Sequence, residues 1–375
     1  MGPLNGLRVI ELEGIGPAPY CGMLLADLGA EVISITRKSS SADRATQVSE
    51  RGKLSIALNL KLPESTEVVL KLCERSDVLI EGFRPGVTER LGIGPEACTA
   101  RNPRLVYGRM TGWGQTGPLA KAAGHDINYI SLSGALHAVG RAGERPVPPV
   151  NLVGDFGGGG MFLAFGVMSA VFEARQSGMG QVVDVSMVEG SASLMHMMYA
   201  RLARGEWRDA RGSNLLDGGA HLYDTYETAD GQFISIGSLE PEFYRLMVEL
   251  SGVDAKEFST YLDPKYWPAL KKRLSEVFKQ KSRDEWCEIM EGTDVCFAPV
   301  LSMREAPQHV HNQARGTFIQ VSGVTQPAPA PRFSRSHPQN PRPAGPAGGD
   351  TDSVLAAAGY DKAQIQALRD RGALK

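Results

Sequence analysis

The chain has 375 residues, of which 40 are basic and 42 acidic, so its formal net charge at pH 7 is -2. This near balance argues against nucleic acid or an acidic membrane surface as the main partner. The length predicts about two domains of roughly 100 to 200 residues each, large enough to bury substantial cores.

Five cysteines lie far apart in the chain, and no two of them form a Cys-x-x-Cys pair. This spacing favours reduced thiols over a disulfide framework or a zinc site, and it predicts a cytoplasmic protein. His309 and His311 lack further residues at metal-ligand spacing, so we expect no metal site. No uninterrupted apolar stretch approaches the roughly 18 to 20 residues that span a bilayer, so we expect no membrane insertion.

The first 36 residues predict a strand, a helix and a second strand. An apolar strand at 7–12 is followed by a turn rich in glycine and proline, a short helix ending at Gly29, and a strand at 30–36. The turn reads G-x-G-x-x-P and lacks the third glycine of a dinucleotide-binding fingerprint, which disfavours an NADP-dependent oxidoreductase. The second strand ends in Arg37. An arginine there suits a phosphorylated ribose, which both NADP and coenzyme A carry.

Basic residues recur where later strands end. Predicted strands at 54–58 and 77–83 flank a helix at about 65–75, and Lys61 and Arg84 follow the two strands. Arg90 lies six residues beyond Arg84. Each alone is most simply a solvated surface charge. Because ligands of open α/β sheets bind at the carboxyl ends of the strands, we expect these three residues and Arg37 to converge as a phosphate site.

Two ionisable residues are predicted at helix starts about thirty residues apart. A strand at 105–110 and a glycine-rich loop at 111–118 lead to His125, and a proline-rich extended segment at 146–149 leads to Asp155. In each case a glycine precedes the ionisable residue, and apolar residues follow at helical spacing. The N–H groups of a first helical turn have no partner within the helix, so they suit a developing negative oxygen.

A histidine and an aspartate facing each other across a gap form a two-base device. Such a device removes a proton from one face of a carbon and returns it to the other face, which is the chemistry of a racemase. The alternative interpretation is structural: a histidine near a helix start is commonly a cap, and glycine-rich helix starts are often only sites of close packing.

The remaining elements predict a change of domain. A helix to about residue 175, a strand at 181–186 and a methionine-rich helix at 187–204 precede a β-hairpin at 223–228 and 232–237. Three helices at 241–250, 268–279 and 283–290, a proline-rich segment at 326–349 and a terminal helix at 350–374 follow. We therefore expect a large α/β domain at 1–200, a linker at 201–222, a small α+β domain at 223–320, and a return segment at 321–375 that packs on the large domain.

Four segments closely resemble 2-methylacyl-CoA racemases of the family III CoA-transferase superfamily, and the match runs in order from Leu7 to about Pro299. These segments are Gly124-His125-Asp126-Ile127-Asn128-Tyr129, Asn151-Leu152-Val153-Gly154-Asp155-Phe156, Leu215-Leu216-Asp217-Gly218-Gly219-Ala220 and Leu239-Glu240-Pro241-Glu242-Phe243-Tyr244. The resemblance implies a Rossmann-like parallel sheet, a smaller α+β domain with an antiparallel hairpin, and an interlocked homodimer. In such a dimer the active site lies between the large domain of one subunit and the small domain of the other.

The resemblance also implies roles for individual residues. It assigns catalysis to His125, Asp155, Asp126 and Glu240, with Glu240 coming from the partner's small domain to lie near Asp155. The alternative is structural: Glu240 is a carboxylate at a helix N-terminus, where its negative charge interacts favourably with the dipole of its own helix. The implied acyl-CoA site contains Ile15, Arg37, Leu58, Asn59, Leu60, Lys61, Gly82, Phe83, Arg84, Arg90, Gly124, Ile127, Asn128 and Tyr129.

The predicted reaction is a 1,1-proton transfer through an enolate, with no metal or redox cofactor. The backbone N–H of Asp126 is the expected enolate donor, and its side chain is expected to cap or to hydrogen-bond rather than to transfer a proton. The nearest alternative is a family III CoA-transferase, in which Asp155 becomes acylated and CoA passes to a free acid. A catalytically silent CoA-binding protein is disfavoured because both bases are present.

Overall fold

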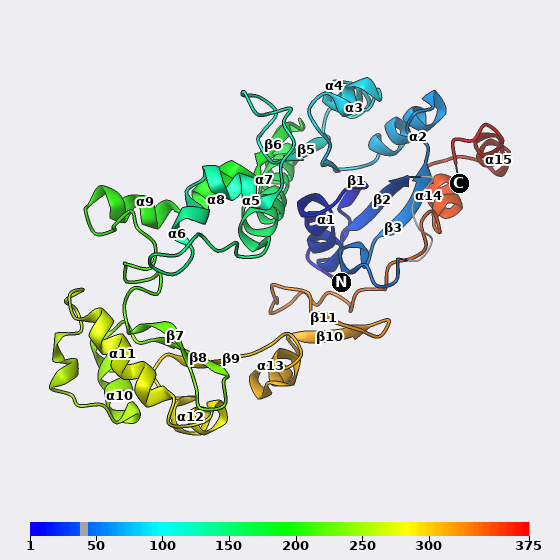
Figure 1. Cartoon of the computed structure of the whole chain (residues 1–375). Helices are drawn as coiled ribbons and strands as arrows, with labels where there is room; N and C mark the ends of the chain where they lie inside the picture. The colour runs from blue at the N-terminus through cyan, green and yellow to red at the C-terminus, as the bar shows by residue number, and fades with distance from the viewer. Residues whose placement is uncertain (38–43, 375) are drawn as a thin grey trace. The chain divides into compact units, whose positions relative to one another are not determined.

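The computed structural model describes residues 1–37 and 44–374, and Figure 1 follows the chain from end to end. The chain separates into two compact units. The first contains Met1–Ser133, Val150–Leu194 and Ala314–Lys375, and the second contains Gly134–Pro149 and Met195–Gln313. Residues 134–149, within the range expected for the large domain, thus belong to the second unit.

A six-stranded parallel sheet forms the centre of the first unit. Its strands are β1 (Arg8–Leu12), β2 (Glu31–Arg37), β3 (Leu54–Leu58), β4 (Val78–Glu81), β5 (Val106–Thr111) and β6 (Val182–Ser186). They lie in the order β3-β2-β1-β4-β5-β6, and each neighbouring pair is parallel. This order confirms the predicted Rossmann-like architecture. The order reverses at the β1–β4 pair, where doubly wound sheets open a crevice at the carboxyl ends of the strands.

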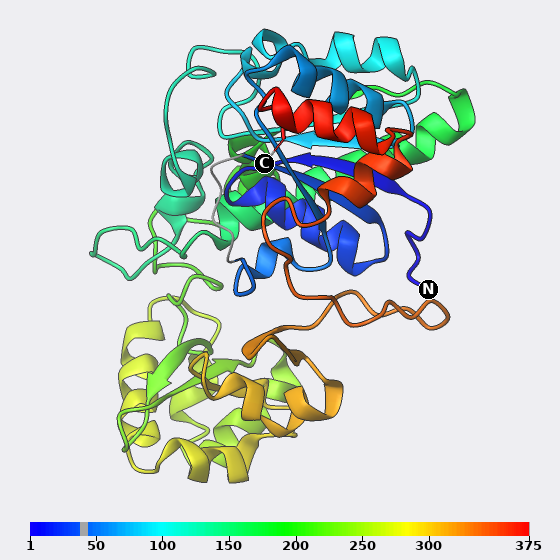
Figure 2. The same cartoon turned by 90° about the vertical axis from the view of Figure 1, so that its right-hand side faces the viewer.

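Alternate residues of the strands supply two separate cores, because successive side chains of a strand point to opposite faces. Ile10 and Leu12 belong to the core on one face, which also contains residues of α2 (Pro63–Cys73), α14 (Thr351–Ala357) and α15 (Lys362–Asp370). Val9 belongs to the core on the other face, with residues of α1 (Pro17–Asp27) and α7 (Phe162–Ser177). Figure 2 shows helices on both sides of the sheet.

Short helices and a hairpin complete the first unit. Helices α3 (Val87–Arg90) and α4 (Pro95–Arg101) follow β4, and a hairpin of β10 (Phe318–Val321) and β11 (Val324–Pro327) precedes the proline-rich segment. The single terminal helix predicted at 350–374 is wrong: α14 and α15 are separate, and Gly359 between them has a φ of 94° that interrupts a helix. Both helices contribute to the core of the first unit, and Leu374, which follows α15, forms a β-bridge with Leu58.

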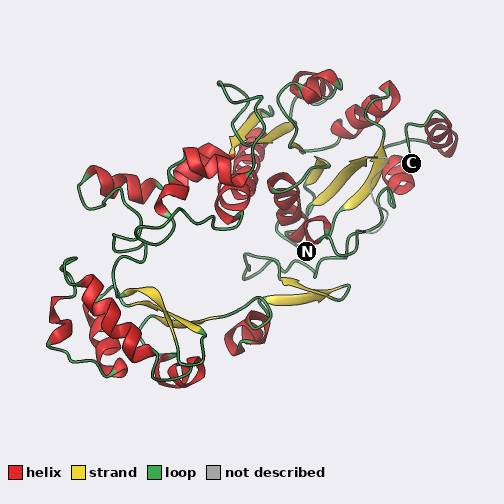
Figure 3. Ribbon diagram, viewed as in Figure 1, coloured by secondary structure: helices red, strands yellow, loops and turns green. Residues whose placement is uncertain are grey.

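The second unit contains a three-stranded antiparallel sheet flanked by helices (Figure 3). Strands β7 (Tyr223–Glu227) and β8 (Phe233–Gly237) form the predicted hairpin, and β9 (Phe297–Val300) pairs with β8. Helices α10 (Pro241–Ser251), α11 (Trp267–Phe278) and α12 (Arg283–Met290) share a core with this sheet. The unit also holds α6 (Ala135–Ala138), α9 (His196–Ala203) and the start of α13 (Val310–Arg315), whose residues from Ala314 onward belong to the first unit.

Two predictions about the helices need correction. The helix expected at 187–204 is broken into α8 (Met187–Leu194) and α9. The sequence predicted no membrane-spanning stretch, but the continuous helical segment Leu152–Ser177 is long and apolar enough to cross a membrane by length and composition. Core helices of soluble proteins meet the same criterion, and α7 packs against β5 and β6.

Candidate active site

A cavity of about 680 Å³ lies in the first unit, beside the carboxyl ends of β1, β4 and β5. Both predicted bases line it. The lining residues are Ile15, Gly16, Pro17, Ala18, Gly82, Phe83, Arg84, Pro85, Met110, Thr111, Gly112, Trp113, Ala120, Ala122, Ala123, Gly124, His125, Asn128, Tyr129, Asn151, Asp155 and Met187. The cavity therefore combines the turn after β1, the segment after β4, the glycine-rich loop after β5 and the two motifs that carry His125 and Asp155.

His125 is the N-cap of α5 (Asp126–Leu132), as the sequence predicted. Its backbone is extended, and its N–H donates to Oδ1 of Asn128 at 3.0 Å. Its carbonyl accepts from the N–H groups of Asn128 and Tyr129. Because these backbone bonds fix the start of the helix, the exposed imidazole is carried to the cavity on a rigid element.

The apolar run after His125 is buried only in part. Ile130 is fully buried, whereas Ile127 and Leu132 are 42% and 61% exposed. Helix α5 ends at Leu132, and Ala135 begins the separate helix α6 after Gly134, whose φ is 85°. The apolar residues at helical spacing after His125 therefore do not lie on one continuous helix, although the prediction of His125 at a helix start is right.

Asp155 lies in the first turn of a π-helix, Leu152–Met161, rather than at the start of an α-helix. π-Helical turns are rare and frequently occur at functional sites. Four consecutive glycines follow Phe156, and they allow close packing: a methyl group on Gly158 would lie 2.6 Å from the backbone nitrogen of Ser191, and one on Gly190 would lie 1.9 Å from the carbonyl oxygen of Gly158. The glycine-rich start predicted as either catalytic or close-packed is in fact a close-packed segment that also carries Asp155.

A direct hydrogen bond joins the segments that carry the two predicted bases. Oδ1 of Asp126, the first residue of α5, accepts from the N–H of Asp155 at 2.7 Å. Asp126 is only 7% exposed, and a side chain on Gly154 would overlap its carboxylate. Asp126 therefore holds the His125 segment and the Asp155 segment in one arrangement.

The electrostatic environment makes Asp155 easier to protonate. Its half-buried position, the largest influence, raises the pKa of the carboxyl above its ordinary value, and Asp126 raises it further. A hydrogen bond from Nδ2 of Asn151 to Oδ2 of Asp155, at 3.1 Å, and the nearby His125 act in the opposite direction. A carboxyl group balanced in this way can both accept and release a proton.

Tyr129 forms the inner wall of the site. Its hydroxyl donates to the carbonyl of Gly124, and its ring packs edge-on against Trp113 with centroids 4.8 Å apart. Burial and the charge of Asp155 raise the pKa of Tyr129, while Arg84 lowers it. A side chain at Gly124 would overlap Tyr129, so the wall requires glycine there.

Three of the four basic residues predicted as a phosphate site lie at or just after the ends of strands of one sheet, and the fourth ends a short helix. Arg37 ends β2, Lys61 comes three residues after β3, Arg84 comes three residues after β4, and Arg90 ends α3. All four side chains are exposed, and Arg84 lines the cavity itself. The parallel topology therefore brings Arg37, Lys61 and Arg84 to the same edge of the sheet.

The other predicted binding residues divide into two groups. Ile15, Gly82, Phe83, Gly124, Asn128 and Tyr129 line the cavity. Leu58, Asn59, Leu60 and Ile127 do not, and the side chain of Leu58 is buried in the core, so only its backbone is available to a ligand.

Glu240 lies in the second unit, as the N-cap of α10. It is exposed, its carboxylate makes no capping hydrogen bond, and Pro241 occupies the first helical position. Its charge helps to raise the pKa of Cys296, although burial has the larger effect.

Two features of the site were not predicted from the sequence: the role of Asn151 and the pairing of Asp126 with Asp155. The spacing of four residues between Asn151 and Asp155 was a usable signal, because side chains at i and i+4 meet along a helix. Within residues 1–37 and 44–374, no three His, Cys, Asp or Glu side chains form a group suited to a metal ion.

The sequence matches the model of CoA-transferase family III over residues 4–351. It is 45% identical to the alpha-methylacyl-CoA racemase of Mus musculus and 43% identical to that of Homo sapiens, in each case over 97% of this chain and 96% of the relative. A solved structure of a CAIB/BAIF family protein from Brucella suis has a TM-score of 0.80 at 24% identity and covers 95% of this chain and 99% of that one. The chain therefore belongs to CoA-transferase family III.

Proposed function

We propose that the protein is a racemase that interconverts the R and S forms of 2-methylacyl-CoA thioesters. The observation that carries the proposal is that His125 and Asp155, two groups able to hold a proton, line one cavity and are fixed by neighbouring segments. The alpha-methylacyl-CoA racemases that are 43–45% identical over nearly the whole chain support it.

The proposed reaction has two proton transfers. One of the two bases takes the α-proton, and the electrons of the broken C–H bond move into an enolate whose negative charge rests on the thioester oxygen. The other base then gives its proton to the opposite face of the α-carbon, and the enolate returns to the thioester. The N–H of Asp126, in the first turn of α5, is the proposed donor to the enolate oxygen.

Positioned acid–base groups typically contribute about 10²- to 10⁴-fold to a rate, so stabilisation of the enolate has to supply much of the remainder. The raised pKa of Asp155 suits this role, because a carboxyl that holds its proton more firmly differs less in basicity from an imidazole. The proposed chemistry uses no metal and no redox cofactor. We assign the CoA moiety to the basic edge formed by Arg37, Lys61, Arg84 and Arg90.

The proposal includes a homodimer in which Glu240 of a second copy approaches Asp155. Support comes from an apolar stripe on the segment 152–177: Met161, Phe165 and Phe172 are 49%, 74% and 69% exposed and recur on one helical face. Exposed apolar patches of this kind mark protein interfaces. We propose a cytoplasmic location from the cysteine pattern.

The test is the exchange of the α-proton in D₂O with single enantiomers of a 2-methylacyl-CoA. Wild-type enzyme should incorporate one deuterium with inversion and without an acceptor acid. By the pattern of the family, His125 serves the S substrate. His125→Ala should therefore lose inversion by more than about 10²-fold and still exchange the R substrate through Asp155 with retention. Asp155→Ala should show the converse preference.

A CoA-transferase is the second candidate, because Asp155 lines the cavity and a nucleophilic aspartate fits that reaction too. In that case turnover requires a free acid as acceptor. The carboxylate of Asp155 attacks the thioester carbonyl to give a mixed anhydride and free CoA; the CoA thiolate then attacks the carbonyl of Asp155 and releases the donor acid, and the resulting thioester of Asp155 accumulates when no acceptor is present. Near wild-type inversion by His125→Ala, or a strict need for an acceptor acid, would replace the racemase by the transferase.

A further inference from the structure

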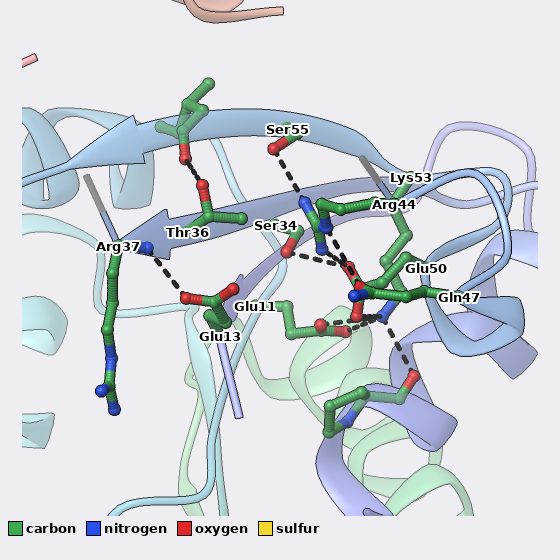
Figure 4. A network of polar contacts seen from close by, with 12 residues as sticks. Glu11, Glu13, Ser34, Thr36, Arg37, Arg44, Gln47, Glu50, Lys53 and Ser55 are labelled. Atoms are coloured by element: carbon green, nitrogen blue, oxygen red, sulfur yellow. Dashed lines mark hydrogen bonds and ion pairs between the residues drawn. The ribbon is translucent and has the colours of Figure 1, made fainter. Parts of the chain in front are cut away.

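A network of buried charged side chains joins β1, α1 and the segment 44–53 (Figure 4). Glu11, Arg44, Glu50 and Lys53 are 0%, 4%, 7% and 6% exposed. Nζ of Lys53 lies 2.7 Å from both carboxylate oxygens of Glu11 and 3.5 Å from Oε1 of Glu50. Arg44 pairs with Glu50 and donates to Oγ of Ser55 at 3.0 Å. Two cations and two anions thus balance when all four are ionised.

The Glu11–Lys53 pair contacts the first half of α1 and fixes its position. Glu11 is two residues after Val9 on β1 and therefore faces the α1 side of the sheet. A methyl group at Gly22 of α1 would lie 1.7 Å from Oε2 of Glu11, so the carboxylate packs directly on the helix backbone. Nζ of Lys53 also donates to the carbonyl of Pro19, in the first turn of α1, at 3.0 Å.

Helix α1 in turn packs on the π-helix that carries Asp155. A methyl group on Gly160 would lie 2.8 Å from the carbonyl oxygen of Pro17, and the rings of Tyr20 and Phe156 meet edge-on with centroids 5.0 Å apart. Gly16, the N-cap of α1, faces the carboxylate itself: a methyl group there would lie 3.3 Å from Oδ2 of Asp155. A shift at the start of α1 is therefore passed to the wall that faces Asp155.

We propose that Glu11 and Lys53 are positioning residues that hold the start of α1 against Asp155 and so set its reactivity. The role in catalysis rests on the proposed racemase function, whereas the mechanical role does not. Stability alone is a poor reason for such a pair, because a buried ion pair is often no more stabilising than apolar residues of similar volume.

The pair should respond to pH. Burial, the largest influence, raises the pKa of Glu11 to about 7, while Lys53 lowers it and Glu50 raises it. The other charged or titratable groups around it are Arg44 and Cys21. Both oxygens of Glu11 accept from one ammonium group, so protonating either oxygen turns an acceptor into a donor and breaks one of the two contacts. The contacts that hold α1 should therefore weaken as the pH falls through about 7.

Glu11→Gln tests the proposal because its amide also replaces one acceptor by a donor and thus imitates the protonated state at every pH. The measurement is α-deuterium incorporation from D₂O, with each enantiomer, between about pH 5.5 and 8.5. Above about pH 8 the variant should lose roughly 10- to 100-fold on the side served by Asp155, since a displacement near 1 Å can cost about 10²-fold. Below about pH 6 the exchange rates of wild type and Glu11→Gln should converge. Because the catalytic groups titrate in both proteins, the ratio of the two rates at each pH removes their contribution.

Glu50→Gln is the matched control. It makes the same chemical change in the same network, but the carboxylate of Glu50 hydrogen-bonds to Arg44 and Ser34 and lies 3.5 Å from Nζ of Lys53, whereas the carboxylate of Glu11 packs on the backbone of α1 at Gly22. It should reduce stability without a preferential loss on the Asp155 side. A pH-independent ratio of wild type to Glu11→Gln, or equal losses for both enantiomers, overturns the proposal.

A second measurement tests the proposal on the wild-type protein alone, in case Glu11→Gln does not fold. Amide hydrogen exchange of residues 14–20 in the wild-type protein, corrected for its intrinsic pH dependence, should show protection falling as the pH drops through about 7. Unchanged protection overturns the positioning role. If the wild-type protein exchanges no α-proton at all, the proposed function fails, and the amide measurement still decides whether Glu11 and Lys53 hold α1.

Discussion

Replacing Asn151 by alanine tests how the protein sets the basicity of Asp155. Nδ2 of Asn151 donates to Oδ2 of Asp155 at 3.1 Å, and this bond favours the ionised carboxylate. Its loss should raise the pKa of Asp155. A hydrogen bond to a charged group contributes about 1.5–3 kcal/mol, and solvent screening of a half-buried group reduces this to about 1 kcal/mol. Since about 1.36 kcal/mol is a factor of ten, the ionised fraction on the acidic limb should fall about fivefold.

The assay is the pH profile of α-proton exchange for the enantiomer served by Asp155. The acidic limb of Asn151→Ala should move to higher pH, while the rate on the alkaline plateau changes little. Asn128→Ala is the control, because Asn128 also lines the cavity but its side chain bonds to the backbone of His125. If the limb of Asn151→Ala stays in place, or if Asn128→Ala moves it equally, the hydrogen bond does not set the basicity of Asp155.

Three further predictions concern other parts of the molecule. Arg37→Ala should weaken binding of a CoA thioester tenfold or more, at about 1.5–3 kcal/mol for a charge-assisted contact, and should spare an analogue without the 3'-phosphate; calorimetry that finds equal losses refutes the assignment. Burial lowers the pKa of His221 to about 4, so its contribution to stability is present above about pH 6.5 and is lost as the pH falls towards 4; denaturant unfolding should show up to about 3 kcal/mol of this pH dependence missing in His221→Gln. Replacing Phe165 and Phe172 by serine should lower the yield of folded dimer without giving a folded monomer, because interlocked subunits separate only on unfolding; a folded, active monomer in sedimentation equilibrium, of this variant or of the wild type, would contradict the proposed assembly.

Local patterns in the sequence determined most of the first unit. The apolar strands and the helices between them predicted a βαβ start, and alternation around Ala229-Asp230-Gly231 predicted the hairpin of the second unit. The glycine before His125 and the apolar residues that follow it at helical spacing predicted a helix start there, because capping is decided within a few residues. These features depend on neighbours in the chain, so the sequence alone contains the information.

Helix type and helix breaks depended on contacts between segments far apart in the chain. Spacing predicted an α-helix starting at Asp155, but the packing of Gly158 against Gly190 accompanies a wider π-helix that starts at Leu152. The methionine-rich run read as one helix because its residues favour helix throughout, yet it breaks between Leu194 and His196. Propensity is a weak guide wherever tertiary packing offers a better arrangement.

The chemistry of the site likewise depended partly on the sequence and partly on the tertiary structure. The sequence by itself determined which groups were present, His125 and Asp155, since residue type fixes the proton that each can carry. Only the tertiary structure decided that Asp126 ties them together and that Glu11, far along the chain from Asp155, lies behind the helix that faces it. Burial and charge act through space, and the distance between two side chains in space is set by the folding of the whole sheet and its helices.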